Sequence, residues 1–409
     1  MDNKCCKKVS VYVYLLASVK LILTIIMVMS IVCVSRMICY ASNNMPELEN
    51  DMSMQQLFDD YVDMKDIDDD LFEIADVNGD RPGISFQDIF GLLKAGNIEG
   101  AINKSFESIG QNMTAEILEN RGLLGRLLIL IIIASVFNNY SSVLKYSYVG
   151  EQGFFITYIM SVSILIKSFF LIYDMTENAI RYISEAMECM IPAFAMSLIL
   201  CSGIATSQMT NSIFVMVLSV MEKVILYGVL PMIRIYFFIV LLNQLNGKDR
   251  FSKLAELIKQ ISEWLLKGFV ASVIGLNAVK SMLVPVYENV RYNMLQKGIS
   301  MIPGGSAFSN ISGIIIGGGV LIKNCVGVTA SLVLIVIGSV PLLKLMYFYI
   351  SYRLVLAAAQ PVSDQRILAG IQGACDSAGV LIKSILTAIA LCVLSISIII
   401  ISTNVRLYS

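Results

Sequence analysis

Long apolar runs recur along most of this chain, and many of them are long enough to cross a lipid bilayer. A spanning helix needs about 20 predominantly apolar residues, and a soluble protein of this size would not need so many runs of that length. The composition agrees, because 56% of the residues are hydrophobic and 15% are charged, against about 45–50% and 25% in soluble domains. The sequence therefore predicts an all-α polytopic membrane protein.

Charge is distributed unevenly along the chain. Residues 42–120 hold 18 acidic and four basic residues, a balance of −14, so the rest of the chain carries +13 of the net −1. This asymmetry predicts a small acidic region attached to a membrane-embedded body. Spaced apolar residues within it, as in "MQQLFDDYVDMKDIDDDLFEI", predict short amphipathic helices. No basic patch with interleaved aromatic residues occurs, which argues against nucleic acid as a partner.

The chain opens on a basic and then an apolar stretch. Lys4, Lys7 and Lys8 precede the run "LILTIIMVMSIVCV", which has the length of the apolar part of a secretory signal. We expect this segment to be a signal peptide cleaved before Ser42, or else a retained N-terminal anchor. In both cases the acidic region is extracytoplasmic. The expected domains are a signal peptide or anchor at 1–41, an extracytoplasmic region at 42–120 and a polytopic membrane domain at 121–409.

The absence of histidine narrows the chemistry that the chain can perform. It removes histidine-based acid–base catalysis, the Ser-His-Asp and Cys-His arrangements, and most zinc sites. The five cysteines beyond Ser42 are scattered without metal-ligand spacing. The stretch "DVNGDRPGISFQ" begins like a calcium-binding loop but lacks the central glycine and the final glutamate. We therefore expect no catalytic residue, no metal site and no cofactor.

Two parts of the membrane domain resemble each other at an offset of about 110 residues. "YDMTENAIRYISEAMECMIP" ends at Pro192, and "YENVRYNMLQKGISMIP" ends at Pro303. Further on, "GVLPMIRIYFF" aligns with "GSVPLLKLMYFY" at nearly the same offset. Agreement at several places indicates an internal duplication, which is common in transporter-like and channel-like membrane proteins. The expected repeats are approximately 122–227, 228–337 and, in part, 338–409.

Each repeat is expected to contain two helices joined by a polar connector. The first helices are predicted at 122–140, 228–243 and 338–356, and the second helices at 153–173, 265–286 and 379–401. The connectors, around Lys145, Arg250 and Arg366, hold more basic residues than the segments between successive pairs. Because cytoplasmic loops carry an excess of lysine and arginine, this pattern predicts that all three connectors face the cytoplasm.

The second connector contains its own amphipathic pattern. In "FSKLAELIKQISEWLLKGF", residues 251–269, apolar residues recur at helical spacing and charged residues occupy the opposite face. We expect a helix that lies along the inner membrane surface, with binding of a partner protein as the alternative.

Glycines interrupt the apolar stretch "MIPGGSAFSNISGIIIGGGVLIKN" at residues 301–324. A G-x-x-x-G spacing lets another backbone approach closely, which favours tight helix packing. The alternative is a re-entrant or pore-lining element, since irregular backbone at membrane depth must be buried in protein or face water. The candidate residues for either structure are Pro303, Gly304, Gly305, Gly313, Gly317, Gly318 and Gly319.

Charged residues inside the apolar runs are candidates for a polar path across the membrane. Charges are expensive at this depth, so they usually face the interior of a bundle or a water-filled cavity. The positions that we select are Glu222, Lys223 and Lys323.

The order of these features resembles that of the stage III sporulation protein AE family of endospore-forming bacteria. The likeness covers essentially everything from residue 122, and "MIPGGSAFSNISGIIIGGGVLIKNCVG" and "AAAQPVSDQR" carry it most specifically. The acidic region resembles the family only in its position and character.

The resemblance implies a membrane component of a secretion-like channel that joins mother cell and forespore and is required for late forespore development. It also implies a location in the mother-cell membrane around the forespore. The implied partners are the other stage III A proteins and stage II protein Q, besides the lipid bilayer and a possible second copy of the chain. The resemblance carries no catalytic residues. A stand-alone small-molecule permease is the alternative function, because repeats and interrupted helices suit it equally well.

Overall fold

A computed structural model of the chain describes residues 62–78, 84–109, 147–202, 219–245, 251–275, 305–360 and 365–402, together with residues 129 and 216. Every regular element within these residues is helical. The labelled helices are α3 (Met64–Asn78), α4 (Phe86–Lys94), α6 (Ser147–Cys189), α7 (Ile191–Ser202), α9 (Leu230–Leu245), α11 (Gly305–Ala359) and α12 (Gln365–Ser402). A π-helical turn, η1 (Ile225–Val229), directly precedes α9, and further helices span 98–109 and 252–275. The expected all-α class is confirmed.

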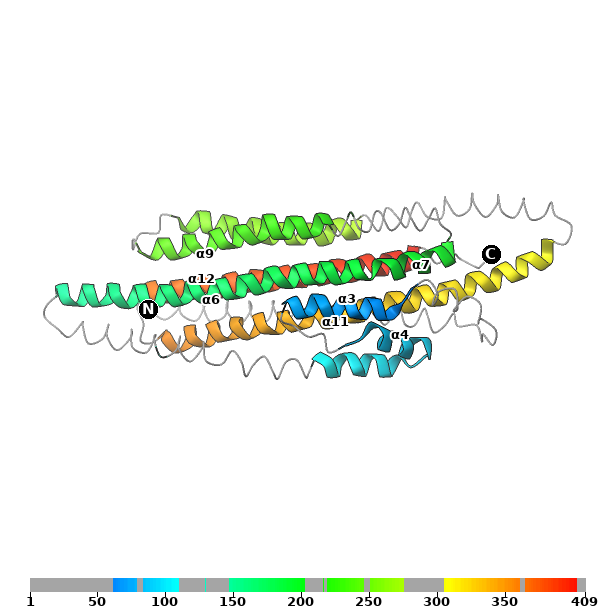
Figure 1. The fold of residues 1–409 in the computed structure, drawn as a ribbon. Coiled ribbons are helices and arrows are strands. Elements are labelled where there is room, and N and C mark those ends of the chain that lie inside the picture. The colour runs from blue at the N-terminus through cyan, green and yellow to red at the C-terminus, as the bar shows by residue number, and fades with distance from the viewer. Residues whose placement is uncertain are drawn as a thin grey trace, which may run out of the picture.

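The long helices form an elongated bundle, in which α6 and α12 run in one direction and α9 and α11 run in the other (Figure 1). Phe169 of α6 stacks on Phe237 of α9, with ring centroids 4.0 Å apart. A hydrogen bond joins the hydroxyls of Ser168 in α6 and Tyr352 in α11. Figure 1 shows that the end of α9, the end of α11 and the start of α12 lie at the same end of the bundle. We call this the connector end.

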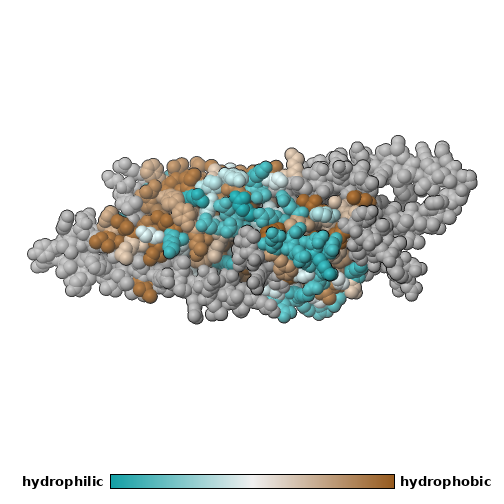
Figure 2. All heavy atoms as spheres, viewed as in Figure 1, coloured by the Kyte–Doolittle hydropathy of each residue, from teal (hydrophilic) through white to brown (hydrophobic). Residues whose placement is uncertain are grey.

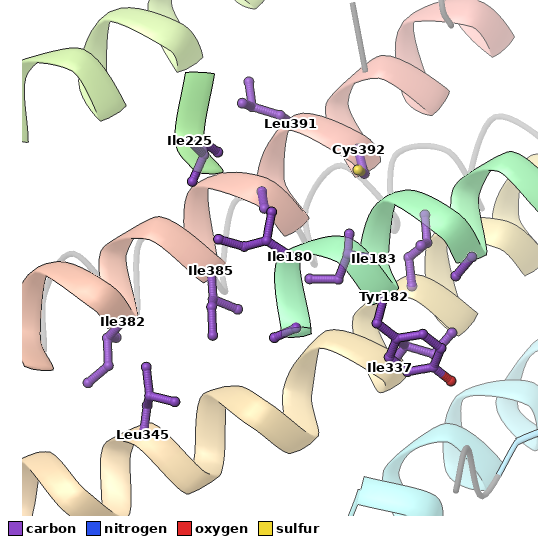
Figure 3. Packing of buried hydrophobic residues seen from close by; sticks show 14 of the residues in the cluster. Ile180, Tyr182, Ile183, Ile225, Ile337, Leu345, Ile382, Ile385, Leu391 and Cys392 are labelled. Atoms are coloured by element: carbon purple, nitrogen blue, oxygen red, sulfur yellow. The ribbon is translucent and has the colours of Figure 1, made fainter. Parts of the chain in front are cut away.

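Helix α12 lies in the centre of the bundle. It contacts α11, α6 and α9, and none of its described residues between Ile367 and Ser397 is exposed. Figure 3 shows Ile382 and Ile385 of α12 close to Ile180 of α6 and Leu345 of α11. All four of these side chains are buried. The apolar side chains of α12 therefore pack against other helices of the chain.

Four helical stretches of the described chain are long and apolar enough to cross a membrane. They are Ile159–Ile199, Ser219–Asn243, Gly319–Ala359 and Gln365–Ser397. This agrees with the expected polytopic membrane protein. At 1.5 Å per residue, α11 is roughly 80 Å long, far more than the hydrocarbon core of about 30 Å. Part of each long helix therefore lies outside the bilayer core.

The described part of the acidic region is a small helical unit docked on the bundle. Asp68 of α3 is buried and accepts hydrogen bonds from the backbone amides of Phe86 and Gln87. These amides belong to the first turn of α4, where amide groups lack partners within the helix and the dipole favours a carboxylate. The Ser85 side chain caps the same turn. Helix α3 packs against α6, and α4 packs against α11.

Several helices are longer than the sequence patterns predict. The helix expected at 153–173 extends to Cys189, although five charged residues lie between Asp174 and Glu188. It continues because a buried stripe at helical spacing continues, with Thr176, Ile180, Ile183 and Met187 facing the core. A buried stripe on one face of a helix outweighs charges on the other. The helix predicted at 338–356 is likewise part of α11, and the one predicted at 379–401 is part of α12.

The expected location of segment 251–269 is wrong in one respect. This segment is helical, but it runs beside α12 along the bundle, because Lys259 and Glu263 both pair with side chains of α12. Because α12 contains one of the stretches that are long and apolar enough to span, a helix that runs beside it does not lie flat on the membrane surface. Of its charged residues, Lys259 and Glu263 meet α12, whereas Lys253, Glu256 and Lys267 are exposed.

Some expectations concern residues that the structure does not describe. Among them are the signal peptide or anchor at 1–41, the helix at 122–140, and Pro303 and Gly304. The repeats and the extracytoplasmic location of the acidic region remain predictions.

Candidate functional site

Asp376 is the centre of a polar network inside the bundle. Its Oδ2 lies 3.2 Å from Nζ of Lys259 and accepts a hydrogen bond from the Tyr236 hydroxyl at 3.4 Å. Its Oδ1 accepts a hydrogen bond from Nε2 of Gln372 at 3.0 Å. The network therefore joins α9, helix 252–275 and α12, and both carboxylate oxygens have partners.

A second ion pair joins helix 252–275 and α12 further from the connector end. Nζ of Lys383 in α12 lies 2.8 Å from Oε1 of Glu263 in helix 252–275. The order of the charges is reversed between the pairs, since α12 supplies first the acid and then the base. A shifted register would bring like charges together, so the two pairs also specify how the helices align.

Two arginines lie against aromatic rings in the same half of the bundle. The guanidinium carbon of Arg234 in α9 is 4.1 Å from the ring centroid of Tyr173 and 5.7 Å from that of Phe170, both in α6. Arg353 of α11 donates a hydrogen bond from Nη2 to the Tyr349 hydroxyl at 2.9 Å. Aromatic faces attract cations, and this attraction strengthens where water is excluded.

The arrangement holds charges at membrane depth without leaving them isolated. A carboxylate or ammonium in an apolar surrounding is costly, and partner charges offset that cost. Within the described residues, no group of three or more acidic or cysteine side chains could hold a metal ion. The network can thus hold α9, helix 252–275 and α12 in position relative to one another and present polar groups within the bundle.

The three residues chosen from the sequence for a polar path lie in different surroundings. Lys323 is fully buried in α11, and its Nζ donates a hydrogen bond to the backbone carbonyl of Ile400 in α12 at 3.1 Å. Glu222 is half-buried, and Lys223 is exposed. Lys323 therefore supports the last turn of α12, where a cation near free carbonyls is favourable. A path through these three residues remains a prediction.

The candidate glycines that the structure describes belong to one helix. Gly305, Gly313, Gly317, Gly318 and Gly319 all lie in α11. The backbone is helical from Gly305 to Ala359, and Gly319 is buried. Whether the stretch packs closely or forms a re-entrant element remains a prediction.

The sequence patterns do not predict the Asp376 network, because each of its charges taken alone fits another role. Lys259, for example, belongs to the second connector, whose basic residues predict only its side of the membrane. The available signal was spacing: Lys259 and Glu263 are four residues apart, and Asp376 and Lys383 are seven apart. Both spacings place charges on one face of a helix, with opposite signs available on the other.

The long apolar helices and the paired charges between them define a polytopic, all-α membrane protein. The chain belongs to the stage III sporulation protein AE family, whose model matches residues 84–403. The match begins within the acidic region, earlier than the resemblance from residue 122 had indicated. Since α4 packs against α11, this part of the acidic region belongs to the same structural unit.

A curated relative supports this assignment. The chain is 21% identical over 255 residues to the stage III sporulation protein AE of Bacillus subtilis (strain 168). The aligned part covers 62% of this chain and 64% of the relative, so the match spans just under two thirds of the relative's length. No solved structure matches the chain.

Proposed function

We propose that this protein is a non-enzymatic component of a membrane channel complex between mother cell and forespore. The main support is the family match, which covers nearly the whole described bundle and names a sporulation protein. The paired charges within the bundle are consistent with this role, because polar groups at membrane depth commonly mark transport pathways.

The proposal extends to location and partners. The protein lies in the mother-cell membrane around the forespore, with its acidic region outside the cytoplasm. It works with the other stage III A proteins and stage II protein Q, alone or as several copies of the chain. The absence of histidine and the paired state of Asp376 and Glu263 support a role without catalysis.

Deletion of the gene in its endospore-forming host tests the proposal. We expect the deletion strain to complete engulfment and then to lose late gene expression in the forespore, measured with a fluorescent reporter. Expression of the intact chain from a second locus should restore the reporter signal. Normal spores in the deletion strain would contradict the proposal.

A reconstitution experiment separates a channel component from a stand-alone permease. A permease transports its substrate when it is the only protein in a vesicle, whereas a channel component requires its partners. Uptake of a small solute by vesicles that contain the purified chain alone would favour the permease.

A further inference from the structure

We propose that helix 252–275 is a further membrane-spanning helix, which contacts lipid through a stripe from Phe251 to Trp264. This helix is not among the four described stretches that length and composition identify as spans. Its many charges lower its apolar character, with Lys253, Glu256, Lys259, Glu263 and Lys267 all within it. The proposal concerns lipid contact and does not depend on a role in sporulation.

The direction of the helix is the first argument. It follows α9 after a short connector and runs alongside α12, as its two ion pairs with Asp376 and Lys383 require. Asp376 and Lys383 lie in one of the apolar spans. At 1.5 Å per residue the described helix is roughly 36 Å long, enough to cross a hydrocarbon core of about 30 Å.

The faces of helix 252–275 differ in whether another helix covers them. Lys259 and Glu263, the charges in the middle of the helix, face α12 and are paired there. Ser262, also in the middle of the helix, is buried. An exposed apolar stripe recurs every three or four positions: Phe251, Leu254, Leu257, Ile261 and Trp264. Lys253, Glu256, Gln260 and Lys267 are exposed beside this stripe. Paired charges toward the bundle and an apolar stripe toward the outside are the arrangement of a helix in contact with lipid.

Lys253 and Glu256 fit one edge of the bilayer, because they are exposed and pair with each other near the connector end. Trp264 is 73% exposed and follows Lys253 by 11 residues, which is roughly 16 Å along the helix and about half of the hydrocarbon core. Trp264 then lies near the middle of the bilayer, and the long stem of Lys267 lets its ammonium reach toward the opposite edge.

Neighbouring surfaces agree with lipid as the occupant. Ile235 and Leu242 of α9, and Ile350 and Leu354 of α11, are exposed as well. Figure 2 shows hydrophobic residues gathered toward the connector end and hydrophilic ones over the middle, where α3 and the second half of α6 lie. So much exposed apolar surface is unusual on a protein surrounded by water.

The single tryptophan of the chain makes the proposal directly testable. The intact protein is placed in vesicles of phosphatidylcholine brominated either near the headgroup or near the chain end, and the fluorescence of Trp264 is recorded. We expect Trp264 to be quenched by bromine near the chain end and to be little affected by iodide in solution. Moving the probe in a Leu254→Trp, Trp264→Phe variant should shift the strongest quenching to bromine near the headgroup.

A matched control places the probe on a polar surface. In an Asn178→Trp, Trp264→Phe variant the tryptophan lies on the exposed charged face of α6, and iodide should quench it. Equal depths for positions 254 and 264 would show a helix parallel to the membrane plane and overturn the proposal. Quenching of Trp264 mainly by iodide would show a surface in contact with water. Protection from both quenchers would show that a second copy or another protein covers the stripe, and would equally overturn lipid contact.

Discussion

Individual lysines in this protein have different roles because their partners differ. Lys259 pairs with a carboxylate between two helices, and Lys323 supports a helix terminus through a backbone carbonyl. Lys253 lies on the surface, where its side chain is 93% exposed. A buried ion pair contributes through the cost of breaking it, whereas an exposed pair contributes about 0–1 kcal/mol. The contribution of a lysine to stability therefore differs from one position to the next.

Exchanging the charges of Lys259 and Asp376 tests the importance of their pairing. Asp376→Lys alone places two ammonium groups together, and we expect a lower unfolding temperature in detergent and less protein in the membrane. The double variant Lys259→Asp, Asp376→Lys should recover a large part of the loss. Coupling between contacting residues is about 0.5–3 kcal/mol.

The exposed pair of Lys253 and Glu256 provides the control for this experiment. Reversal of one charge there should change the unfolding temperature only slightly, because water screens both side chains. If Asp376→Lys lowered the unfolding temperature as little as Glu256→Lys, the network around Asp376 would not contribute to stability.

Replacing Asp68 with alanine should loosen the start of α4. The variant leaves the amides of Phe86 and Gln87 without their acceptor, at a cost of about 1–3 kcal/mol. Hydrogen exchange of the full-length protein should show faster exchange at the start of α4. Asp66→Ala, an exposed change on the same helix, should leave this exchange unaltered.

At the scale of helices, close approach between α9 and α12 depends on a small residue. A Cβ atom on Gly373 would lie 2.5 Å from Cγ1 of Val240, closer than real carbon atoms approach. The two helices therefore meet where α12 has no side chain, one turn from the Asp376 network. Packing and polar pairing support the same helix contact.

We expect Gly373→Ala to lower the unfolding temperature, since Val240 must move or the helices must separate. A second change, Val240→Ala, should recover part of the loss. Gly268→Ala in helix 252–275 is the comparison, because nothing lies within 4 Å of its Cβ position. That change should be neutral or stabilising, as alanine favours helices over glycine by about 1 kcal/mol. Equal effects of the two substitutions would contradict the packing described.

The sequence could predict the helices but not their full extent or their partners. Apolar runs identify α9, α11 and α12, because lipid and protein cores select the same residues. The continuation of α6 past Asp174 and the inward charges of helix 252–275 depend on which face meets a neighbour. Similarly, Asp376 needs Lys259, a residue more than a hundred positions away. Such pairings follow from tertiary contacts, which one sequence without its fold does not specify.

For the molecule as a whole, the positions of the helix ends predict on which side of the membrane the connectors lie. The end of α9, the end of α11 and the start of α12 lie at the same end of the bundle (Figure 1). Reporter fusions at Arg250 and Arg366 should therefore report the same side, which we expect to be the cytoplasm because both segments are basic. A fusion near Lys145, just before α6, should agree with them. Opposite reports from Arg250 and Arg366 would contradict this arrangement.

The central position of α12 also has a consequence for how the protein is made. Synthesis proceeds from the N-terminus, so α6, α9 and α11 leave the ribosome before the helix that they surround. Until α12 arrives, the faces that will bury it remain uncovered, and Lys259 and Glu263 lack the carboxylate and ammonium that will pair with them. The earlier helices therefore form only a loose assembly in the membrane, which is accessible to quality-control proteases. The bundle closes only when α12 has been synthesised and inserted between them.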